Sequence, residues 1–378
     1  MTDPKGQRYT KLDGLRGLLS IIVALNHSFL VIAIPAFADV WGQNVFQFTD
    51  WQSKFQQIFM ILGNGGAAVT LFFIMSGFVL GLSFSKVTYS PVGLINYLIK
   101  RIIRLYPVYI FLVILTAIYM KTSFAYTIFP QASSWYSWWM NFSMTFKEFI
   151  YNLLFIHAYT GGVTWTLRVI LIASVIFPIF YLISKKTSWW MDILITIFLV
   201  IISFNILNLP NFRDLRYLYM FYSGLSLIKF SEFFKMIPSW VIYLCLPFAL
   251  FILMDVRYMT DEYYGGVIEM IISWNILGLL AFNEKAKLLN IFNTKVLKFF
   301  GRISYSLYLI HFSVLYLLAR AMFVYLNLPF KQYYLLTHTL LFIISLVIAT
   351  GVSIVVYNYI ERPTLALSSK LQIPEKVQ

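Results

Sequence analysis

The stretch GLRGLLSIIVALNHSFLVIAI (residues 14–34) decides the fold, because it is apolar over a length that crosses a membrane as one helix. It nevertheless contains two ionisable side chains, Arg16 and His27. Ionisable groups inside a bilayer are costly to bury, rare and usually functional. Their separation is close to three helical turns, so both lie on one helix face, roughly 16 Å apart. The pair is interpreted either as two ends of one site or as an interfacial arginine and an independently packed histidine.

The composition of the whole chain is that of a membrane protein. Of its 378 residues, 60% are hydrophobic and 12% are charged, and the mean hydropathy is +0.77. Soluble domains are about half apolar and about a quarter charged, and long apolar runs indicate spanning helices rather than barrel strands. We therefore predict an all-α integral membrane protein with a bundle of about ten transmembrane helices. The predicted spans lie near residues 14–34, 62–83, 104–120, 164–183, 190–208, 214–229, 238–254, 264–282, 303–326 and 334–358.

The net charge of +14 follows the predicted orientation of the chain. Lysine and arginine concentrate in every second segment between the spans, beginning with the N-terminal segment. The positive-inside rule then places both termini in the cytoplasm, where the excess charge contacts membrane lipids, and nucleic acid is not an expected partner. Residues 1–363 are expected to form one multispanning membrane domain. Residues 364–378 are expected to form a short polar cytoplasmic tail, because Pro363 ends the last helix.

The longest loop, residues 121–163, lies outside in this topology and is rich in tryptophan. Trp135, Trp138 and Trp139 are typical of an aromatic belt at a membrane interface. Alternatively, they form a platform on which a sugar ring stacks. The apolar stretch 149–157 is too short to span and is expected to be an interfacial or re-entrant helix.

Arg101 and Arg104 form an Arg-x-x-Arg pair at the cytoplasmic end of the third predicted span. Residues three apart on a helix are neighbours, and guanidinium groups match phosphate oxygens in pairs. The alternative is charge anchoring at the membrane surface. Pro107 is typical of a helix start, where free backbone N–H groups also favour anions.

Several other polar residues within or beside the spans are weaker candidates for a site. Small residues around Ser76 predict close helix packing. The single cysteine and the scattered histidines lack the spacing of metal ligands, so no metal site is expected. The supporting candidates are Asp13, Ser76, Trp165, Arg168, Glu269, Ser304, Tyr305 and His311.

Taken in order, these motifs resemble the acyltransferase-3 family of integral membrane acyltransferases. The resemblance covers nearly the whole chain. It implies a carbohydrate O-acetyltransferase type of enzyme, which moves an acyl group, usually acetyl from acetyl-CoA, to a hydroxyl. It also implies that His27 is the catalytic histidine and that Arg101 and Arg104 contact the phosphates of the donor. The matching pieces are Leu-Asp-Gly-Leu-Arg-Gly (12–17) with Arg16-x10-His27, Phe-Phe-x-x-Ser-Gly-Phe (72–78), Arg101-x-x-Arg104, Trp165-Thr166-Leu167, Ile303-Ser304-Tyr305 through His311, and Glu361-Arg362-Pro363.

One position departs from the family pattern. The family commonly places glutamate five residues after the tryptophan of its Trp-Ser/Thr-Leu motif, and this chain has Ile170 there. Glu269 is the nearest candidate replacement, unless it forms an ion pair with Arg168 or Arg320. The departure puts the rate, the acceptor or the activity itself in question.

We therefore expect a multi-pass protein of the bacterial inner membrane that acylates a cell-envelope glycan such as O-antigen, other lipopolysaccharide or exopolysaccharide. Cytosolic acyl-CoA is the co-substrate, with Arg16 assisting its binding, and no permanently bound cofactor is expected. His27 acts as the general base. His311 is either a second ligand contact or a structural hydrogen-bonding group.

Asp13 is roughly 21 Å from His27 along a continuous helix, so it is expected to pair with Arg16 or to cap the helix. A glycan or lipid transporter would also use intramembrane charges, without dependence on acyl-CoA. A non-catalytic relative of the enzyme family would fit Ile170. The sequence indicates no oligomeric state.

Overall fold

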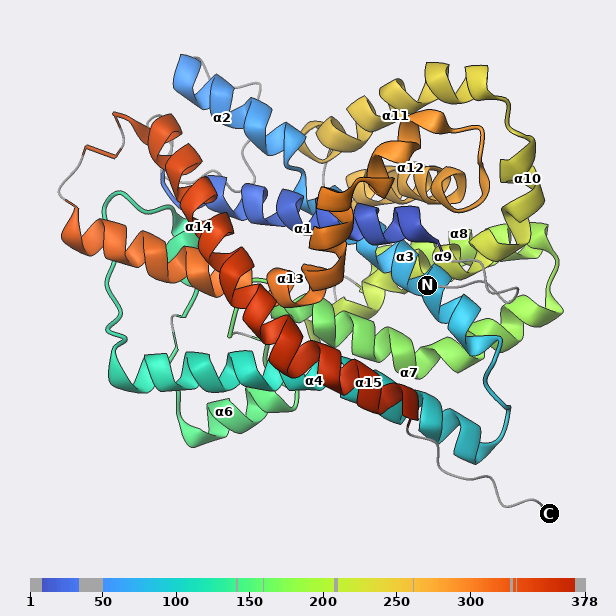
Figure 1. Cartoon of the computed structure of the whole chain (residues 1–378), viewed down its shortest axis with the longest axis horizontal. Helices are drawn as coiled ribbons and strands as arrows, with labels where there is room; N and C mark the ends of the chain where they lie inside the picture. Colours follow the sequence, from blue (N-terminus) through green and yellow to red (C-terminus); the bar gives the residue numbers. More distant parts are fainter. Residues whose placement is uncertain are drawn as a thin grey trace.

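The computed structural model describes residues 9–33, 50–140, 142–158, 160–206, 210–260, 262–326, 329–330 and 332–370. The described chain is helical throughout (Figure 1), apart from an isolated antiparallel bridge between Ile32 and Ala132. Four further segments are 3₁₀ or π turns: η2 (Pro210–Tyr217), η3 (Leu227–Phe230), η4 (Lys287–Asn293) and the π-helical η5 (Tyr357–Glu361). The helices are α1 (Thr10–Phe29), α2 (Trp51–Leu62), α3 (Gly65–Phe84), α4 (Pro91–Thr122), α5 (Ser134–Trp138), α6 (Phe146–Leu153), α7 (Thr164–Lys186), α8 (Trp189–Ile206), α9 (Leu218–Ser226), α10 (Ser231–Met236), α11 (Ser239–Met259), α12 (Glu262–Phe282), α13 (Lys295–Tyr325), α14 (Tyr334–Val356) and α15 (Arg362–Lys370).

Seven helical stretches among the described residues are long and apolar enough to cross a membrane. The described residues of all ten predicted segments are largely helical, but 14–34, 190–208 and 214–229 do not meet that measure. α1 carries three charged residues in its first two turns, and α9 is only 9 residues long. The chain is therefore a multi-pass helical membrane protein, and seven of the predicted spans are supported by length and composition.

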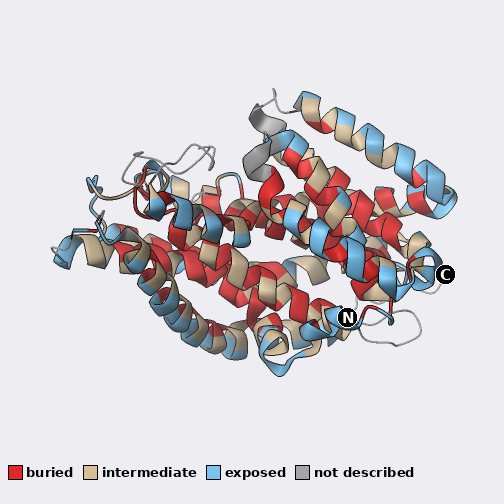
Figure 2. Cartoon of the chain, turned by 90° about the horizontal axis from the view of Figure 1, so that it is seen from above, coloured by how far each residue is buried: buried red, intermediate tan, exposed pale blue. Residues whose placement is uncertain are grey.

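The outer surface of the bundle is apolar, as expected for helices that face lipid. Figure 2 shows buried residues along the inner helices and exposed residues on the outer ones. On α8, α11 and α14 the exposed side chains include Ile197, Phe248 and Val347. A soluble protein rarely exposes so much contiguous apolar surface.

α1 lies in the interior and packs most extensively against α13. Glycines allow this contact. A Cβ atom on Gly301 would lie 1.9 Å from the carbonyl oxygen of Asp13, and one on Gly17 would lie 2.3 Å from that of Leu297. Only glycine permits so close a backbone approach. Gly17 of α1 and Gly301 of α13 therefore set the distance between the helices that carry the candidate histidines.

α3 and α9 meet in the same way. A Cβ atom on Gly77 would lie 2.0 Å from the carbonyl oxygen of Phe221, and one on Gly224 would lie 1.9 Å from that of Ile74. This contact holds the other face of α3 away from α9 and leaves Ser76 partly exposed. The predicted close packing around Ser76 is confirmed at Gly77.

Two predictions based on proline are wrong. Pro107 lies inside α4, which begins at Pro91, so Arg101 and Arg104 are in a helix interior and not at a helix start. Membrane helices tolerate proline where neighbouring groups satisfy the freed backbone. Pro363 does not end the last helix, because α15 continues to Lys370 after the π-helical turn η5. Proline is tolerated in the first turn of a helix, where its missing N–H would be unpaired anyway.

The predicted tail and outer loop are more structured than expected. Residues 364–370 are helical and pack against α4, with Ser368 donating a hydrogen bond to the carbonyl oxygen of Lys100 at 3.4 Å. Residues 371–378 lie outside the described residues. In the loop 121–163, the short apolar stretch begins within α6, which at 8 residues is too short to span.

Candidate functional site

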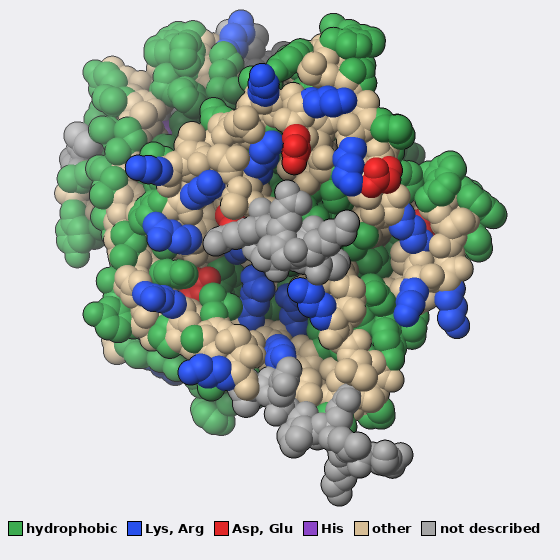
Figure 3. Space-filling view, turned by 45° about the vertical axis from the view of Figure 1, so that its right-hand side comes forward, with side chains coloured by type: hydrophobic (Ala, Val, Ile, Leu, Met, Phe, Trp, Pro, Cys, Tyr) green, Lys and Arg blue, Asp and Glu red, His purple; other side chains and the backbone are tan. Residues whose placement is uncertain are grey.

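A cavity opens between α1, α3, α4, α7, α13 and η5, and we call it the arginine cavity. Its volume is about 130 Å³, and a buried water needs roughly 10–15 Å³, so the space exceeds an ordinary packing defect. On the face of the molecule in Figure 3, lysine and arginine side chains gather around a hollow. The residues that line the arginine cavity include Arg16, Phe72, Ser76, Arg101, Arg104, Thr166, Ile170, Ser304, Tyr305, Tyr308 and Glu361.

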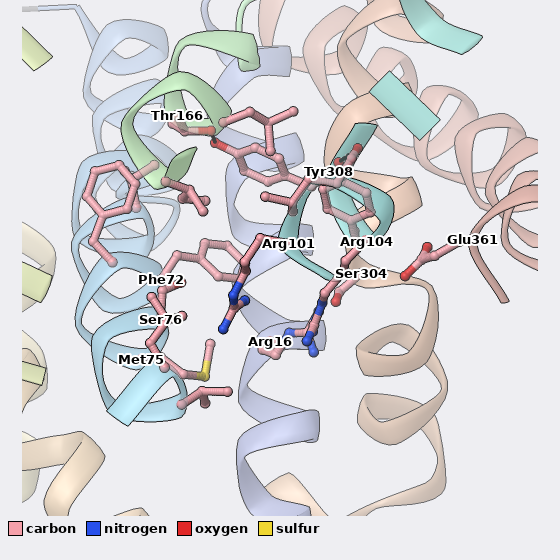
Figure 4. A pocket seen from close by; sticks show the side chains of 18 residues that line it. Arg16, Phe72, Met75, Ser76, Arg101, Arg104, Thr166, Ser304, Tyr308 and Glu361 are labelled. Carbon is pink, nitrogen blue, oxygen red and sulfur yellow. Dashed lines mark hydrogen bonds between the residues drawn. The ribbon is translucent and has the colours of Figure 1, made fainter. Parts of the chain in front are cut away.

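Three guanidinium groups converge in this cavity. Arg16 comes from α1, and Arg101 and Arg104 come from successive turns of α4 (Figure 4). Arg101 stacks on the ring of Tyr97, with 5.7 Å between guanidinium carbon and ring centroid. Within the described ranges none of the three forms an ion pair. The cavity thus has a concentration of positive charge and donors suited to phosphate oxygens.

Glu361 supplies a single negative charge at the edge of the cavity. Its Oε2 accepts a hydrogen bond from Ser306 at 2.5 Å, and the carboxylate interacts electrostatically with Arg16 and Arg104. The residue lies in the π-helical turn η5, and such turns are frequent at functional sites. We had not predicted Glu361 as a site residue, although a glutamate in the last motif at the end of the last span was a usable signal.

His27 contacts a second histidine from the other end of the chain. Its Nδ1 lies 3.0 Å from Nε2 of His311, which is 284 residues away in sequence. The two rings stack with centroids 5.2 Å apart. Nδ1 of His311 lies 3.1 Å from the carbonyl oxygen of Leu307, one turn earlier on α13. His311 is buried and His27 is partly exposed. We call these two residues the histidine pair.

Aromatic side chains from the loop 121–163 pack against the histidine pair. Trp135 lies 5.3 Å from the ring of His27, and Trp139 packs against Phe312 at 5.2 Å. The loop is attached to α1, because Ser133 donates to the carbonyl oxygens of Val31 and Leu30. Trp138 is 61% exposed, as in an interfacial belt, whereas Trp135 is partly buried against His27. The tryptophans of this loop therefore have different surroundings.

Tyr308 separates the arginine cavity from the histidine pair. Its ring lines the cavity and lies 6.0 Å from the ring of His311 and 5.6 Å from that of Phe72. Its hydroxyl accepts a hydrogen bond from Thr166 at 3.2 Å. Neither residue was predicted as a site residue, although Thr166 belongs to the Trp165-Thr166-Leu167 motif and Tyr308 lies between Tyr305 and His311 in another. The arginine cavity and the histidine pair therefore lie on either side of the hydrogen-bonded Thr166 and Tyr308.

Of the remaining predicted site residues, Ser304 and Tyr305 line the arginine cavity, whereas Trp165 and Arg168 do not. Tyr305 donates a hydrogen bond to the carbonyl oxygen of Leu105 at 2.5 Å. Trp165 packs against Tyr217, with ring centroids 5.3 Å apart. Arg168 forms an ion pair with Asp214 at 2.5 Å and not with Glu269.

Asp13 is not the residue that begins α1. The N-cap position is Tyr9, and Asp13 lies in the first turn, where a carboxylate is favoured by the helix dipole. It is not among the residues that line the arginine cavity. Its backbone instead forms the contact with Gly301 that brings α1 against α13.

Ile170 and Glu269 lie in different places. Ile170 lines the arginine cavity, so the departure from the family pattern is at the cavity wall itself. Glu269 is fully buried on α12, where Thr70 donates to Oε2 at 3.0 Å and Asn64 donates to Oε1 at 3.3 Å. Arg320 donates to the carbonyl oxygen of Ala125 at 2.6 Å. Glu269 is therefore no geometric replacement for a carboxylate at position 170.

Comparison with known proteins identifies a family. Residues 9–358 match the family model of the acyltransferase domain, acyltransferase-3. This range includes the arginines and histidines described above and ends before Glu361. Searches of curated proteins and of solved structures found no match.

Proposed function

The chain belongs to the acyltransferase-3 family, and on that premise we propose that it transfers an acyl group, acetyl in the first instance, from cytosolic acyl-CoA to a hydroxyl of a cell-envelope glycan. The observation that carries this proposal is the convergence of Arg16, Arg101 and Arg104 in one cavity. Arginine forks bind phosphate through paired, charge-assisted hydrogen bonds. The phosphates of coenzyme A are the ligand that this arrangement fits best.

The donor would extend from the arginine cavity towards the histidine pair. Arg16 and His27 are on one face of α1, roughly 16 Å apart along the helix axis. Tyr308 and Thr166 lie between the cavity and the pair. The narrow pantetheine arm passes this point when Tyr308 moves aside, and it brings the thioester to His27.

His27 then acts as the general base for the acceptor hydroxyl. Imidazole is the side chain best suited to proton transfer near neutral pH. The acceptor approaches from the side of the outer loop, where Trp135 lies against His27. Sugar rings have apolar faces that pack on tryptophan, and this supports a carbohydrate acceptor such as O-antigen or exopolysaccharide. In this arrangement both chain termini are cytoplasmic and the protein lies in a bacterial inner membrane.

The experiment that tests this function is transfer of radiolabelled acetyl from acetyl-CoA in membranes that contain the full chain. The envelope glycan fraction is counted for wild type, His27→Ala and His338→Ala. His338 is a matched control, since it is also buried and contacts α1 through the carbonyl oxygen of Ser28 at 2.8 Å. We expect label with wild type and His338→Ala, and none above background with His27→Ala. Equal label with His27→Ala would remove this histidine from the chemistry.

Absence of label with all three correctly inserted proteins would contradict the proposed donor or acceptor. Ile170 in the cavity wall would then favour the non-catalytic alternative. Binding of coenzyme A to the purified protein separates the cases. A protein that binds coenzyme A without transfer has the donor site but an untested acceptor, whereas one that does not bind has no donor site.

A further inference from the structure

The contacts of the histidine pair determine which ring nitrogens carry hydrogen. Nδ1 of His311 lies 3.1 Å from the carbonyl oxygen of Leu307, which can only accept a hydrogen bond. A neutral His311 therefore has its hydrogen on Nδ1 and a lone pair on Nε2. This lone pair lies 3.0 Å from Nδ1 of His27. It follows from the hydrogen-bond pattern that His27 donates through Nδ1.

The surroundings of His311 favour its neutral form. It is 2% exposed on α13, between Tyr308 and the ring of His27. A second proton would place an unpaired positive charge in the interior of the bundle, which is strongly unfavourable. No acidic side chain forms an ion pair with it among the described residues. The neutral hydrogen-bond chain from His27 through His311 to Leu307 is therefore the consistent assignment.

We propose that His311 is a positioning residue, which holds His27 in the tautomer with hydrogen on Nδ1 and so makes Nε2 of His27 the catalytic base. This inference rests on the proposed acyltransferase function. A neighbouring hydrogen-bond acceptor fixes the tautomer and ring orientation of a catalytic imidazole and raises its basicity. The aromatic contacts of His27 with Trp135 and Phe312, at 5.3 and 5.9 Å, hold the ring in the same orientation.

The proton balance follows from this assignment. The acceptor oxygen forms a bond to the thioester carbonyl carbon while its proton passes to Nε2 of His27. The imidazolium ion that forms is stabilised by its Nδ1–H donating to the lone pair of His311. When the carbon–sulfur bond breaks, Nε2 returns the proton to the leaving thiolate. The products are the ester and free coenzyme A, and His27 regains its initial tautomer.

The test compares His311→Leu with His311→Gln in the full-length protein. Leucine removes the acceptor, whereas the amide oxygen of glutamine can still accept from His27. With acetyl-CoA and the envelope glycan fraction as substrates, we expect His311→Leu to lower kcat by about 10–100-fold. KM for acetyl-CoA stays near the wild-type value, because the arginine cavity is intact. His311→Gln recovers most of the kcat lost in His311→Leu. The control His338→Leu has a kcat near the wild-type value.

A second readout does not need the acceptor. Diethyl pyrocarbonate modifies unprotonated imidazole. The rate at which it modifies His27 is measured by peptide mass spectrometry. We expect a several-fold slower rate in His311→Leu, and the wild-type rate in His311→Gln and His338→Leu. Unchanged kcat and unchanged labelling in His311→Leu would overturn the proposal, as would equal losses in His338→Leu. If wild type transfers no acetyl, the proposed function fails, and the labelling rates still decide the coupling of the two histidines.

Discussion

The arginine cavity and the histidine pair share α1 and α13 but differ in how their polar groups are paired. In the cavity, Arg16, Arg101 and Arg104 form no ion pair within the part of the chain that the structure describes. In the pair, His27 and His311 are connected to each other and to the backbone by hydrogen bonds. Three arginines beside one carboxylate leave an excess of positive charge for an anionic ligand, whereas a completed hydrogen-bond chain fixes the orientation of a reacting group. Changes in the cavity should therefore alter donor affinity, and changes in the pair should alter kcat.

The largest effect is expected for His27→Gln. Glutamine preserves some packing and hydrogen bonding but cannot accept the acceptor's proton, so kcat should fall by about 10²–10⁴-fold. The Kd for coenzyme A should stay within about twofold of wild type, because the three arginines are unchanged. Acetyl transfer and calorimetric binding of coenzyme A measure the two quantities. A parallel loss of binding would show that the two regions are not separable.

The reverse pattern is expected for Arg101→Gln combined with Arg104→Gln. Each charged hydrogen bond lost costs about 1.5 kcal/mol or more, so the Kd for coenzyme A should rise by roughly tenfold or more per arginine. The matched control is Arg302→Gln, which removes an exposed arginine of α13 that stacks on Phe299 and does not line the cavity. At saturating donor, kcat should be close to wild type. If the double variant binds coenzyme A normally, the cavity is not the phosphate site.

The helix contact that places both regions is tested by Gly301→Ala. The added Cβ would lie 1.9 Å from the carbonyl oxygen of Asp13, so α1 and α13 must move apart. Overpacking of this kind costs about 1–3 kcal/mol, which lowers Tm in detergent by several degrees. In Gly351→Ala the Cβ meets nothing within 4 Å, and alanine is the better helix former, so Tm should be unchanged or higher. Equal Tm values for the two variants would mean that the close contact does not contribute to stability.

The sequence predicted the residues of these two regions better than their arrangement. Helical spacing placed Arg101 beside Arg104 and put Arg16 on the face of His27. Spacing within one helix contains no information about a partner 284 residues away. The hydrogen bond from His27 to His311 could therefore not be predicted without knowing that α1 packs on α13. Gly14 and Gly17 belong to a sequence motif, but the motif does not reveal their role. In the structure they allow the backbone of α1 to approach the backbones of η4 and α13.

The predictions that the structure contradicts concern helix ends and buried carboxylates. Pro107 and Pro363 are each predicted to mark a helix boundary. Pro107 is instead tolerated inside α4, where neighbouring groups satisfy the freed backbone, and Pro363 lies in the first turn of α15, where its missing N–H has no cost. Glu269 was chosen as the replacement for a family glutamate because both are intramembrane carboxylates. The structure instead brings Glu361 to the arginines from the opposite end of the chain. Which acidic residue reaches a site depends on tertiary packing, which hydropathy does not encode.

The smallest effects are expected when a carboxylate is added to the arginine cavity or removed from it. Ile170→Glu adds a negative charge at the cavity wall, and this charge competes with donor phosphates for the arginines. Glu361→Gln removes a negative charge from the same cavity while its side-chain oxygen can still accept from Ser306. We expect the Kd for coenzyme A to rise about two- to fivefold in the first variant and to fall by a similar factor in the second. Ile170→Gln, which is polar but uncharged, is the control.

The combined variant Ile170→Glu with Glu361→Gln has the same formal charge in the cavity as wild type. If the cavity acts on the donor only through its total charge, the two changes cancel and the wild-type Kd returns. If the arginines are held in specific directions by Glu361, the combined variant binds coenzyme A more weakly than the sum of the single effects. Deviation from additivity in this cycle therefore measures whether Glu361 orients Arg16 and Arg104 or only lowers their combined charge.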